Sequence, residues 1–185
     1  MANAIILLAD GFEEIEALTT VDVLRRGGVN VAMASVSAGS EVRGAHGMTV
    51  RADVLLKDLE DELFDAIILP GGGEGTENLK SSEAVMEALH RHKEGNRLIC
   101  AICAAPTVLV AAGVLEPGQH ITCYPTCVME LDRRAAGVPV VVDGNVITGQ
   151  APGASMLFAL VILKALTTDA VAGKVARGLV TDVLD

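Results

Sequence analysis

Cys103 is the residue whose surroundings point most directly to chemistry. It ends the apolar run Leu98-Ile99-Cys100-Ala101-Ile102 and precedes the small residues Ala104-Ala105. A buried strand that leads through a tight turn of small residues into a helix has the order of a nucleophile elbow, the device that presents the serine of α/β-hydrolases. A cysteine at a helix N-terminus also gains thiolate character from the helix dipole and free amides. The pattern indicates a candidate nucleophile, and a small buried core cysteine is the other interpretation.

The four cysteines also allow a redox or metal interpretation. Cys100 and Cys103 have the spacing of a redox dithiol, and together with Cys123 and Cys127 they have the form C-x2-C-x19-C-x3-C of a zinc cluster. Both interpretations require an exposed Cys100, whereas its apolar run predicts a strand that buries it. We therefore expect no metal, and we expect Cys123 and Cys127 to be incidental small residues on a loop near the site.

A glycine-rich segment, Gly71-Gly72-Gly73-x-Gly75, follows the strand predicted at 66–69. Its spacing matches neither the dinucleotide fingerprint nor a P-loop, so it predicts a flexible loop rather than a phosphate site. The bare amides of such a loop could approach a reacting oxygen beside Cys103 and form an oxyanion hole with the Ala104 amide.

Three glutamates, Glu13, Glu14 and Glu16, crowd the start of the first predicted helix. Carboxylates at this end complement the helix dipole, which alone can explain them. Glu16, however, could face the cysteine loop, where burial would raise its pKa. A protonated carboxyl would then donate a hydrogen bond to a Cys103 thiolate and favour the charged sulfur.

The elements that must position these residues alternate between short apolar runs and helical patterns. This order predicts an α/β fold with a mostly parallel sheet and helices on both faces. The predicted strands are 4–9, 30–36, 66–69 and 98–102, the predicted helices are 13–26, 82–94, 105–112, 153–166 and 168–175, a small hairpin or edge excursion is predicted at 42–51, and a hairpin joins 139–142 to 146–148. Because ligands bind outside the carboxyl ends of such strands, we expect the loops 10–16, 70–75 and 103–106 to lie close together.

Length and composition limit the class of protein. The 185 residues fit one domain, 1–185, and a net charge of −10 gives no electrostatic basis for binding nucleic acid or anionic lipid. Apolar residues make up 51% of the chain and aromatic residues 2%, which suits a buried parallel sheet built from aliphatic side chains. The uncharged stretch 144–163 is too interrupted by glycine and proline to span a membrane, and the N-terminus lacks a secretory signal. We expect a soluble, cytoplasmic protein.

Five segments together resemble one known family. They are Ala9-Asp10-Gly11-Phe12-Glu13-Glu14-Ile15-Glu16, Val21-Asp22-Val23-Leu24-Arg25-Arg26, Leu69-Pro70-Gly71-Gly72, Ala101-Ile102-Cys103-Ala104-Ala105-Pro106 and Pro152-Gly153. Here the chain resembles the ThiJ/PfpI superfamily, and within it the branch of the parkinsonism-associated protein deglycase and the bacterial YajL-type proteins. The resemblance implies a flavodoxin-like three-layer sandwich, usually a homodimer without a cofactor. It also implies Cys103 as the reactive cysteine, Glu16 as its protonated partner, and an oxyanion and substrate site at the Gly72 and Ala104 amides, beside Gly71 and Tyr124.

Two positions depart from the pattern of many relatives. Tyr124 stands where many of them place a histidine near the cysteine, although YajL-like relatives also carry an aromatic residue there. With an ordinary pKa of about 10, a tyrosine cannot replace an imidazole base near neutral pH. His46 falls about where relatives have an arginine that approaches the partner subunit's site, so it could supply a titratable group across a dimer or be a plain surface histidine.

Other differences are smaller. Relatives often show Ser/Thr-Arg-Gly-Pro-Gly-Thr where this chain has Gly149-Gln150-Ala151-Pro152-Gly153-Ala154, so an anion-attracting arginine is missing and the preferred charge of the substrate could differ. The remaining histidines, His90, His92 and His120, are predicted to be solvated.

Two functions of different classes would use the same thiolate. In a glyoxalase or deglycase, Cys103 adds to the aldehyde of methylglyoxal, glyoxal or an early glycation adduct on a protein, and Glu16 shuttles a proton until a hydroxy acid is released without a cofactor. In a peroxide sensor or redox-regulated chaperone, Cys103 oxidises to a sulfenic or sulfinic acid. Catalytic turnover separates the two. The peptidase activity of more distant PfpI relatives normally needs a histidine and higher oligomers, so it ranks below both.

Overall fold

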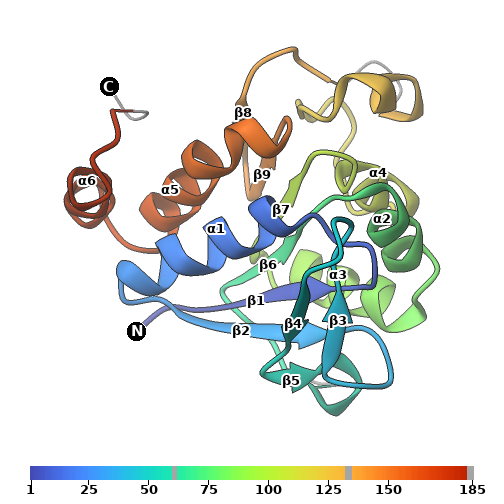
Figure 1. Ribbon diagram of the computed structural model, residues 1–185. Helices are drawn as coiled ribbons and strands as arrows, with labels where there is room; N and C mark the ends of the chain where they lie inside the picture. Colours follow the sequence, from blue (N-terminus) through green and yellow to red (C-terminus); the bar gives the residue numbers. More distant parts are fainter. Residues whose placement is uncertain (60–61, 132–134, 183–185) are drawn as a thin grey trace.

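A mostly parallel sheet forms the centre of the computed structural model, which describes residues 1–59, 62–131 and 135–182 (Figure 1). Its strands are β1 (Asn3–Leu8), β2 (Asn30–Ser35), β5 (Val54–Leu55), β6 (Ala66–Leu69), β7 (Leu98–Ile102), β8 (Val140–Asp143) and β9 (Val146–Gly149). They lie in the order β5-β2-β1-β6-β7-β9-β8, and β8 runs antiparallel to β9 at one edge. In the centre, Ile6 of β1 is paired with Met33 of β2 and Ile68 of β6.

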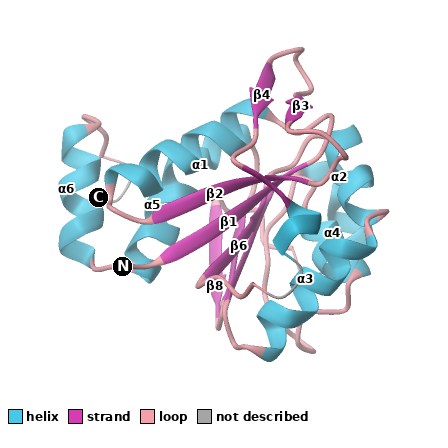
Figure 2. Ribbon diagram, turned by 90° about the horizontal axis from the view of Figure 1, so that it is seen from below, coloured by secondary structure: helices cyan, strands magenta, loops and turns pink. Residues whose placement is uncertain are grey.

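Helices cover both faces of the sheet, as Figure 2 shows. Successive strand residues point to opposite faces, so each buried apolar strand supplies two cores. Ile6 and Leu8 belong to the core beneath α1 (Glu14–Arg26), α5 (Ser155–Leu166) and α6 (Asp169–Gly178). Ile5 and Leu7 belong to the core beneath α2 (Gly73–Lys80), α3 (Glu83–Glu94) and α4 (Pro106–Ala111). The α/β three-layer sandwich expected from the sequence is confirmed.

The predicted element boundaries agree closely with the structure. β6 and β7 coincide with the predicted strands 66–69 and 98–102, and Ser82 caps α3 through a hydrogen bond from the Val85 amide. The C-terminal hairpin turns at Gly144 and Asn145 between β8 and β9. One prediction is wrong, because Gly73 begins the helix α2 where the sequence indicated a flexible loop. Short elements that were not predicted are β5 and the 3₁₀ helices η1 (Leu56–Leu59) and η2 (Pro125–Leu131), and the predicted helix 153–166 begins with a 3₁₀ turn, η3 (Pro152–Ala154), before α5.

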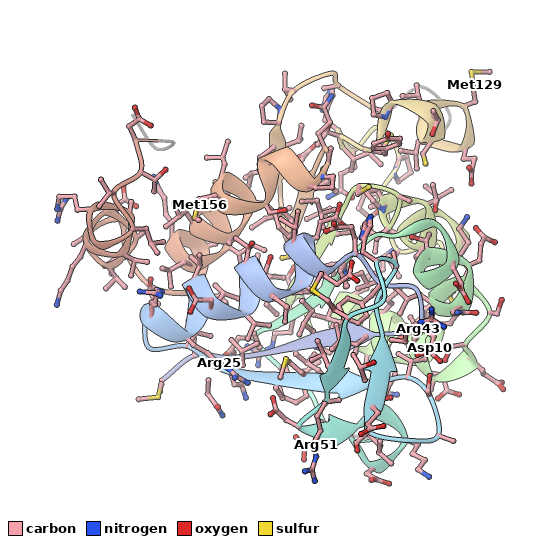
Figure 3. All side chains as sticks on the ribbon, viewed as in Figure 1. Asp10, Arg25, Arg43, Arg51, Met129 and Met156 are labelled. Carbon is pink, nitrogen blue, oxygen red and sulfur yellow. The ribbon has the colours of Figure 1, made fainter. Side chains whose placement is uncertain are left out.

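The predicted excursion at 42–51 is a separate two-stranded hairpin of β3 (Glu41–Arg43) and β4 (Thr49–Arg51). Two hydrogen bonds hold it against the loop after β1. The Gly11 amide donates to the Arg43 carbonyl at 2.7 Å, and the Arg43 amide donates to Asp10 Oδ1 at 2.9 Å. Figure 3 shows Asp10 and Arg43 next to one another. The hairpin is thereby fixed beside the start of α1.

His92 corrects the prediction that the remaining histidines are solvated, because it is 1% exposed. Its ring stacks on Phe64 with centroids 6.5 Å apart, its Nδ1 lies 2.7 Å from the Ala88 carbonyl, and the Phe64 amide donates to its Nε2 at 3.3 Å. Burial lowers the pKa of His92. It is a packed part of α3, whereas His90 and His120 are exposed.

In the described part of the chain, every helix falls short of the length and apolarity that a bilayer span requires.

Candidate active site

Cys103 sits at a strained turn between β7 and α4. Its φ of 66° lies in the left-handed region, which a residue with a side chain adopts at a cost of about 1–3 kcal/mol. The backbone around it fixes this conformation. The Cys103 amide donates to the Gly149 carbonyl at 3.0 Å, and the Tyr124 amide donates to the Cys103 carbonyl at 2.7 Å. The elbow expected from the sequence is present, and it keeps the Cys103 side chain 8% exposed.

Glu16 approaches Cys103 from the first turn of α1. Its side chain is fully buried, and the Gly71 amide donates to its Oε2 at 2.7 Å. Its Oε1 is buried without a hydrogen-bond partner within the described residues. A Cβ added to Gly71 would lie 2.7 Å from the Cys103 Cβ and 2.8 Å from Glu16 Oε2. Gly71 is therefore the spacer that lets the carboxyl and the cysteine face each other.

The electrostatics of Glu16 and Cys103 are coupled. Burial raises the pKa of Glu16 to about 7, although hydrogen bonds from the Gly71 amide and Cys103 oppose the rise. Burial also raises the pKa of the Cys103 thiol, and the charge of an ionised Glu16 raises it further, while the Ala104 and Gly72 amides lower it. Near neutral pH Glu16 therefore titrates, whereas the Cys103 thiol keeps its proton.

The expectation that a helix N-terminus lowers the pKa of Cys103 is wrong in direction. Cys103 precedes the N-cap of α4, Ala105, by two residues, so it lies outside the first turn. Its burial and the neighbouring carboxylate outweigh the two amides that favour a thiolate.

The amides of Gly72 and Ala104, predicted to form an oxyanion hole, lie beside the Cys103 side chain. Gly72 has a φ of 93°, and a Cβ there would collide with the Gly11 carbonyl oxygen, so glycine is required. The Glu13 amide donates to the Gly71 carbonyl at 3.0 Å, which ties the glycine segment to the start of α1. The three loops expected to converge at the carboxyl ends of the strands do so.

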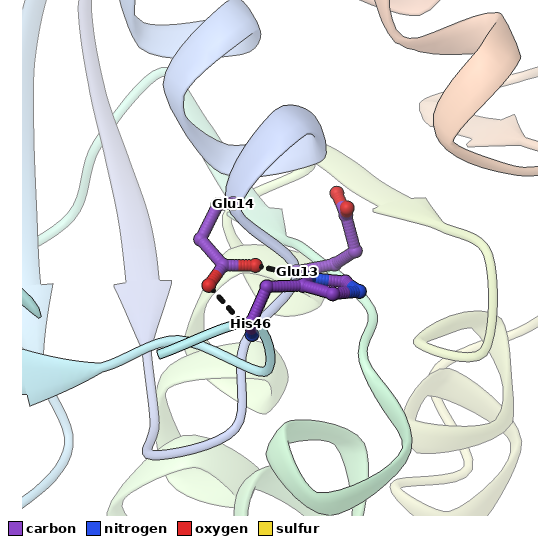
Figure 4. A group of neighbouring side chains, drawn as sticks. All are labelled: Glu13, Glu14 and His46. Atoms are coloured by element: carbon purple, nitrogen blue, oxygen red, sulfur yellow. Dashed lines mark hydrogen bonds and ion pairs between the residues drawn. The ribbon is translucent and has the colours of Figure 1, made fainter. Parts of the chain in front are cut away.

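Tyr124 reaches the site through its backbone, and its side chain is 41% exposed. His46, in contrast, lies against Glu14. Its Nδ1 is 2.7 Å from Glu14 Oε2, and its backbone amide donates to Glu14 Oε1 at 2.7 Å (Figure 4). The hydrogen bond with Glu14 and the charge of that carboxylate raise the pKa of His46. The single chain thus pairs His46 with a glutamate and not with Cys103.

The dithiol and zinc interpretations of the cysteines do not fit the structure. Cys100 is completely buried in β7, as its apolar run predicted. It shares a core with Cys103, whereas Cys123 and Cys127 pack in the core on the opposite face of the sheet. Four cysteines divided between two faces cannot surround one ion.

Comparisons with known proteins identify the family. A family model described as DJ-1/PfpI family matches residues 2–165. The chain belongs to the DJ-1/PfpI family. It is 37% identical to the Parkinson disease protein 7 homolog of Danio rerio, with 96% of each chain covered, and 39% identical to the glutathione-independent glyoxalase DJR-1.2 of Caenorhabditis elegans, with 89% of this chain and 88% of the relative covered. A structure of oxidized Toxoplasma gondii DJ-1 superposes with a TM-score of 0.94 at 34% identity, covering 98% of this chain and 100% of that one.

In this DJ-1/PfpI chain, the capping role expected of the glutamates holds for Glu13, whereas the contact of Glu14 with the hairpin was not predicted. Glu13 caps α1 by accepting the Glu16 amide at 2.7 Å, so it orients the turn that carries Glu16. Glu14 is buried beneath the β3–β4 turn, and a Cβ at Gly44 would collide with its carboxylate. Glu14 and His46 are 32 positions apart in the sequence, so no local pattern could have revealed their contact. Gly44 was the sequence feature that could have indicated a close approach to Glu14.

Proposed function

We propose that this DJ-1/PfpI family member is a cofactor-independent cysteine enzyme that acts on small reactive dicarbonyls, of the glyoxalase or deglycase type. The observation that carries the proposal is the fully buried Glu16, with a pKa of about 7, facing Cys103 across Gly71. A carboxyl that titrates near the working pH can both accept and donate a proton. A relative 39% identical to this chain is named a glutathione-independent glyoxalase, which supports the same class of reaction.

The first step would be addition of Cys103 to methylglyoxal. Glu16 accepts the thiol proton as the sulfur attacks the aldehyde carbon, and the new S–C bond gives a hemithioacetal. The amides of Gly72 and Ala104, which favour negative charge on the sulfur of Cys103, would stabilise the developing oxyanion. Glu16 then returns its proton to that oxygen.

The later steps would move hydrogen within the substrate. Removal of the proton from the aldehyde carbon gives an enediol, and protonation of the neighbouring carbon gives a thioester. Water then hydrolyses the thioester, which releases lactate and restores the Cys103 thiol. The sum is methylglyoxal plus one water, so one carbon is oxidised while its neighbour is reduced and no external oxidant or reductant is consumed.

A second candidate is an oxidation-responsive cysteine sensor or chaperone. Peroxide would convert the Cys103 thiol to a sulfenic acid and release water, and a second equivalent would give a sulfinic acid. The amides of Ala104 and Gly72 and a protonated Glu16 would stabilise the charged product. A structural relative, Toxoplasma gondii DJ-1, is named as oxidized, which supports this second candidate.

The test is lactate formation from methylglyoxal, measured after removal of trace metal and of contaminating glyoxalases. We expect many turnovers by the wild type, a loss of at least a hundredfold in Cys103→Ser, and unchanged rates in Cys127→Ser, a half-buried cysteine outside the site. If the wild type forms no more lactate than Cys103→Ser while Cys103 still reacts with peroxide, the enzyme proposal fails and the sensor takes its place.

We further propose that the protein acts as a homodimer. Apolar side chains are exposed on the outer face of α1 and on the adjacent β3–β4 turn, namely Ile15, Leu18 and Met48. Such a patch beside the site suits a second copy of the chain. Sedimentation should give a dimer for the wild type and for Met129→Glu, an exposed methionine elsewhere, and a monomer for Ile15→Glu. A monomeric wild type would contradict the proposal.

A further inference from the structure

The peptide unit that joins Cys103 to Ala104 carries one half of the proposed oxyanion hole, the Ala104 amide. A peptide unit is planar, and in the trans form its N–H points away from its C=O, so a contact that fixes the Cys103 carbonyl also fixes the direction of the Ala104 N–H. The peptide bonds of the described residues are all trans, and the Tyr124 amide donates to the Cys103 carbonyl at 2.7 Å. The backbone of Tyr124 therefore orients the Ala104 amide.

This orientation needs support from outside the turn. Cys103 has a φ of 66°, and a residue with a side chain stays in the left-handed region only where its surroundings hold it there. The Ala104 amide reaches the sulfur, because its hydrogen bond lowers the pKa of the Cys103 thiol against the stronger effect of burial. Rotation of the Cys103–Ala104 peptide would turn this N–H away from the sulfur and from the developing oxyanion.

Thr148 anchors the segment that carries Tyr124. It lies in β9, the strand beside β7 (Figure 1), where it is paired with Ala101. Its side chain is fully buried, and its Oγ1 accepts a hydrogen bond from the Thr122 amide at 2.8 Å. Thr122 is itself fully buried and precedes Tyr124 by two residues. Thr148 therefore ties the backbone before Tyr124 to the sheet.

The Thr122 side chain is fixed on its other side. Its Oγ1 lies 2.6 Å from the Ala136 carbonyl and 2.8 Å from the Val138 carbonyl, and its single proton can be donated to either. Thr148 thus holds the backbone of Thr122, while the segment 136–138 holds its hydroxyl. Of the two supports, Thr148 is the one that joins Thr122 to a strand next to β7.

We propose that Thr148 is a positioning residue for the oxyanion hole. By accepting the Thr122 amide, it keeps the Tyr124 amide on the Cys103 carbonyl and so directs the Ala104 amide toward the reacting oxygen. It acts through the backbone of these residues. The inference rests on the oxyanion role given to Ala104 in the proposed function, but the reactivity of the Cys103 sulfur reports the same amide without any turnover.

The test compares Thr148→Val, which keeps the shape of the side chain and removes the acceptor oxygen, with Thr148→Ser, which keeps that oxygen. Iodoacetamide should alkylate Cys103 in Thr148→Val about threefold or more slowly than in the wild type at a pH of about 9, because the thiolate loses a hydrogen bond. Thr148→Ser should restore the wild-type rate.

Lactate formation from methylglyoxal should show the same order. Thr148→Val should lower kcat by about tenfold or more with little change in KM, because an oxyanion donor acts mainly in the transition state. Thr148→Ser should keep the wild-type kcat. A wild type that forms no lactate would end the proposed function, and the alkylation rates would still decide the role of Thr148.

Ser35→Ala is the matched control for a general loss of stability. Ser35 is 1% exposed at the end of β2, three strands from β7, and its hydroxyl donates to the Gly39 carbonyl at 2.6 Å. This variant also loses a buried hydroxyl bond, but it should leave the alkylation rate and kcat unchanged. Equal effects of Ser35→Ala and Thr148→Val would overturn the proposal.

Two further results would overturn the positioning role. One is alkylation of Thr148→Val at the wild-type rate or faster, and the other is a Thr148→Ser variant as slow as Thr148→Val. Amide hydrogen exchange in the wild type decides the matter if Thr148→Val does not fold. The Thr122 and Tyr124 amides should exchange slowly, and a Tyr124 amide that exchanges as fast as an exposed loop would contradict its bond to Cys103.

Discussion

Glu16 is a carboxyl placed where water cannot reach it, and its protonation dominates the behaviour of the proposed site. Its Oε2 accepts one strong hydrogen bond, from the Gly71 amide, and its Oε1 is buried without a hydrogen-bond partner among the described residues. A neutral carboxyl can occupy this position at far lower cost than a carboxylate, which is why its pKa rises to about 7.

Glu16→Gln should remove proton transfer while keeping the size of the side chain. We expect the rate of dicarbonyl turnover to fall by about 10²–10⁴, the usual contribution of a general acid–base group. The pH–rate profile should also lose the group that titrates near 7 in the wild type. Steady-state rates of lactate formation between pH 5 and 9 measure both effects, and a variant with the wild-type profile would exclude Glu16 from proton transfer.

Gly71→Ala should close the gap between Cys103 and Glu16. The added Cβ would lie within 3 Å of both side chains, so one of them must move, and overpacking of this kind costs about 1–3 kcal/mol of stability. Alkylation of Cys103 by iodoacetamide and turnover should both fall sharply. Gly73→Ala is the control, since a Cβ there meets nothing within 4 Å. Equal effects of the two substitutions would contradict the spacer role.

The cysteine, its glutamate and the glycine loop could be predicted from the sequence because each belongs to a local pattern at the end of a strand. The pairing of Glu14 with His46 could not, since it joins a helix start to a hairpin 32 residues away. The raised pKa of Cys103 was also beyond the sequence, because it depends on how much solvent the folded chain removes.

At the scale of elements, α2 is the helix that intrinsic helix propensity fails to predict. Its sequence, Gly73-Glu74-Gly75-Thr76-Glu77-Asn78-Leu79-Lys80, contains two glycines and predicts a loop. The helix forms because Gly75 packs against the backbone of the β1–α1 loop, where a Cβ would lie 2.7 Å from the Phe12 amide nitrogen. This tertiary contact therefore requires glycine at position 75, although glycine weakens a helix. The strands were predictable because buried parallel strands read as continuous apolar runs.

The packing of α5 on α1 should control stability without controlling chemistry. Leu163 is completely buried, and its side chain fills the space beside Gly27, at the end of α1 far from Glu16. Leu163→Ala should lower the free energy of unfolding by about 2–5 kcal/mol, as cavity-forming substitutions do. Lys164→Ala removes an exposed ion pair with Asp169 and should change it by less than about 1 kcal/mol. Urea unfolding measures both, and comparable losses would contradict this packing.

For the whole molecule, the buried Glu16 makes stability depend on pH. Its pKa is raised from 4.5 to about 7 on folding, so its contribution to stability is complete below pH 4.5 and is lost as the pH rises through 7. A difference of that size corresponds to about 3 kcal/mol. The wild type should therefore lose about this much stability relative to Glu16→Gln between pH 4.5 and 7.5. Parallel stability curves of the two proteins, measured by urea unfolding, would contradict the raised pKa.

The most direct test of the account is a titration of Glu16 itself. In protein labelled with ¹³C at glutamate carboxyl carbons, the Glu16 signal is identified by its absence in Glu16→Gln and followed from pH 4 to 9. The account predicts a midpoint near 7 in the wild type, and a different midpoint in Cys103→Ser because the Cys103 side chain is hydrogen-bonded to Glu16. A midpoint near the ordinary value of 4.5, unchanged by Cys103→Ser, would contradict the coupling between Glu16 and Cys103.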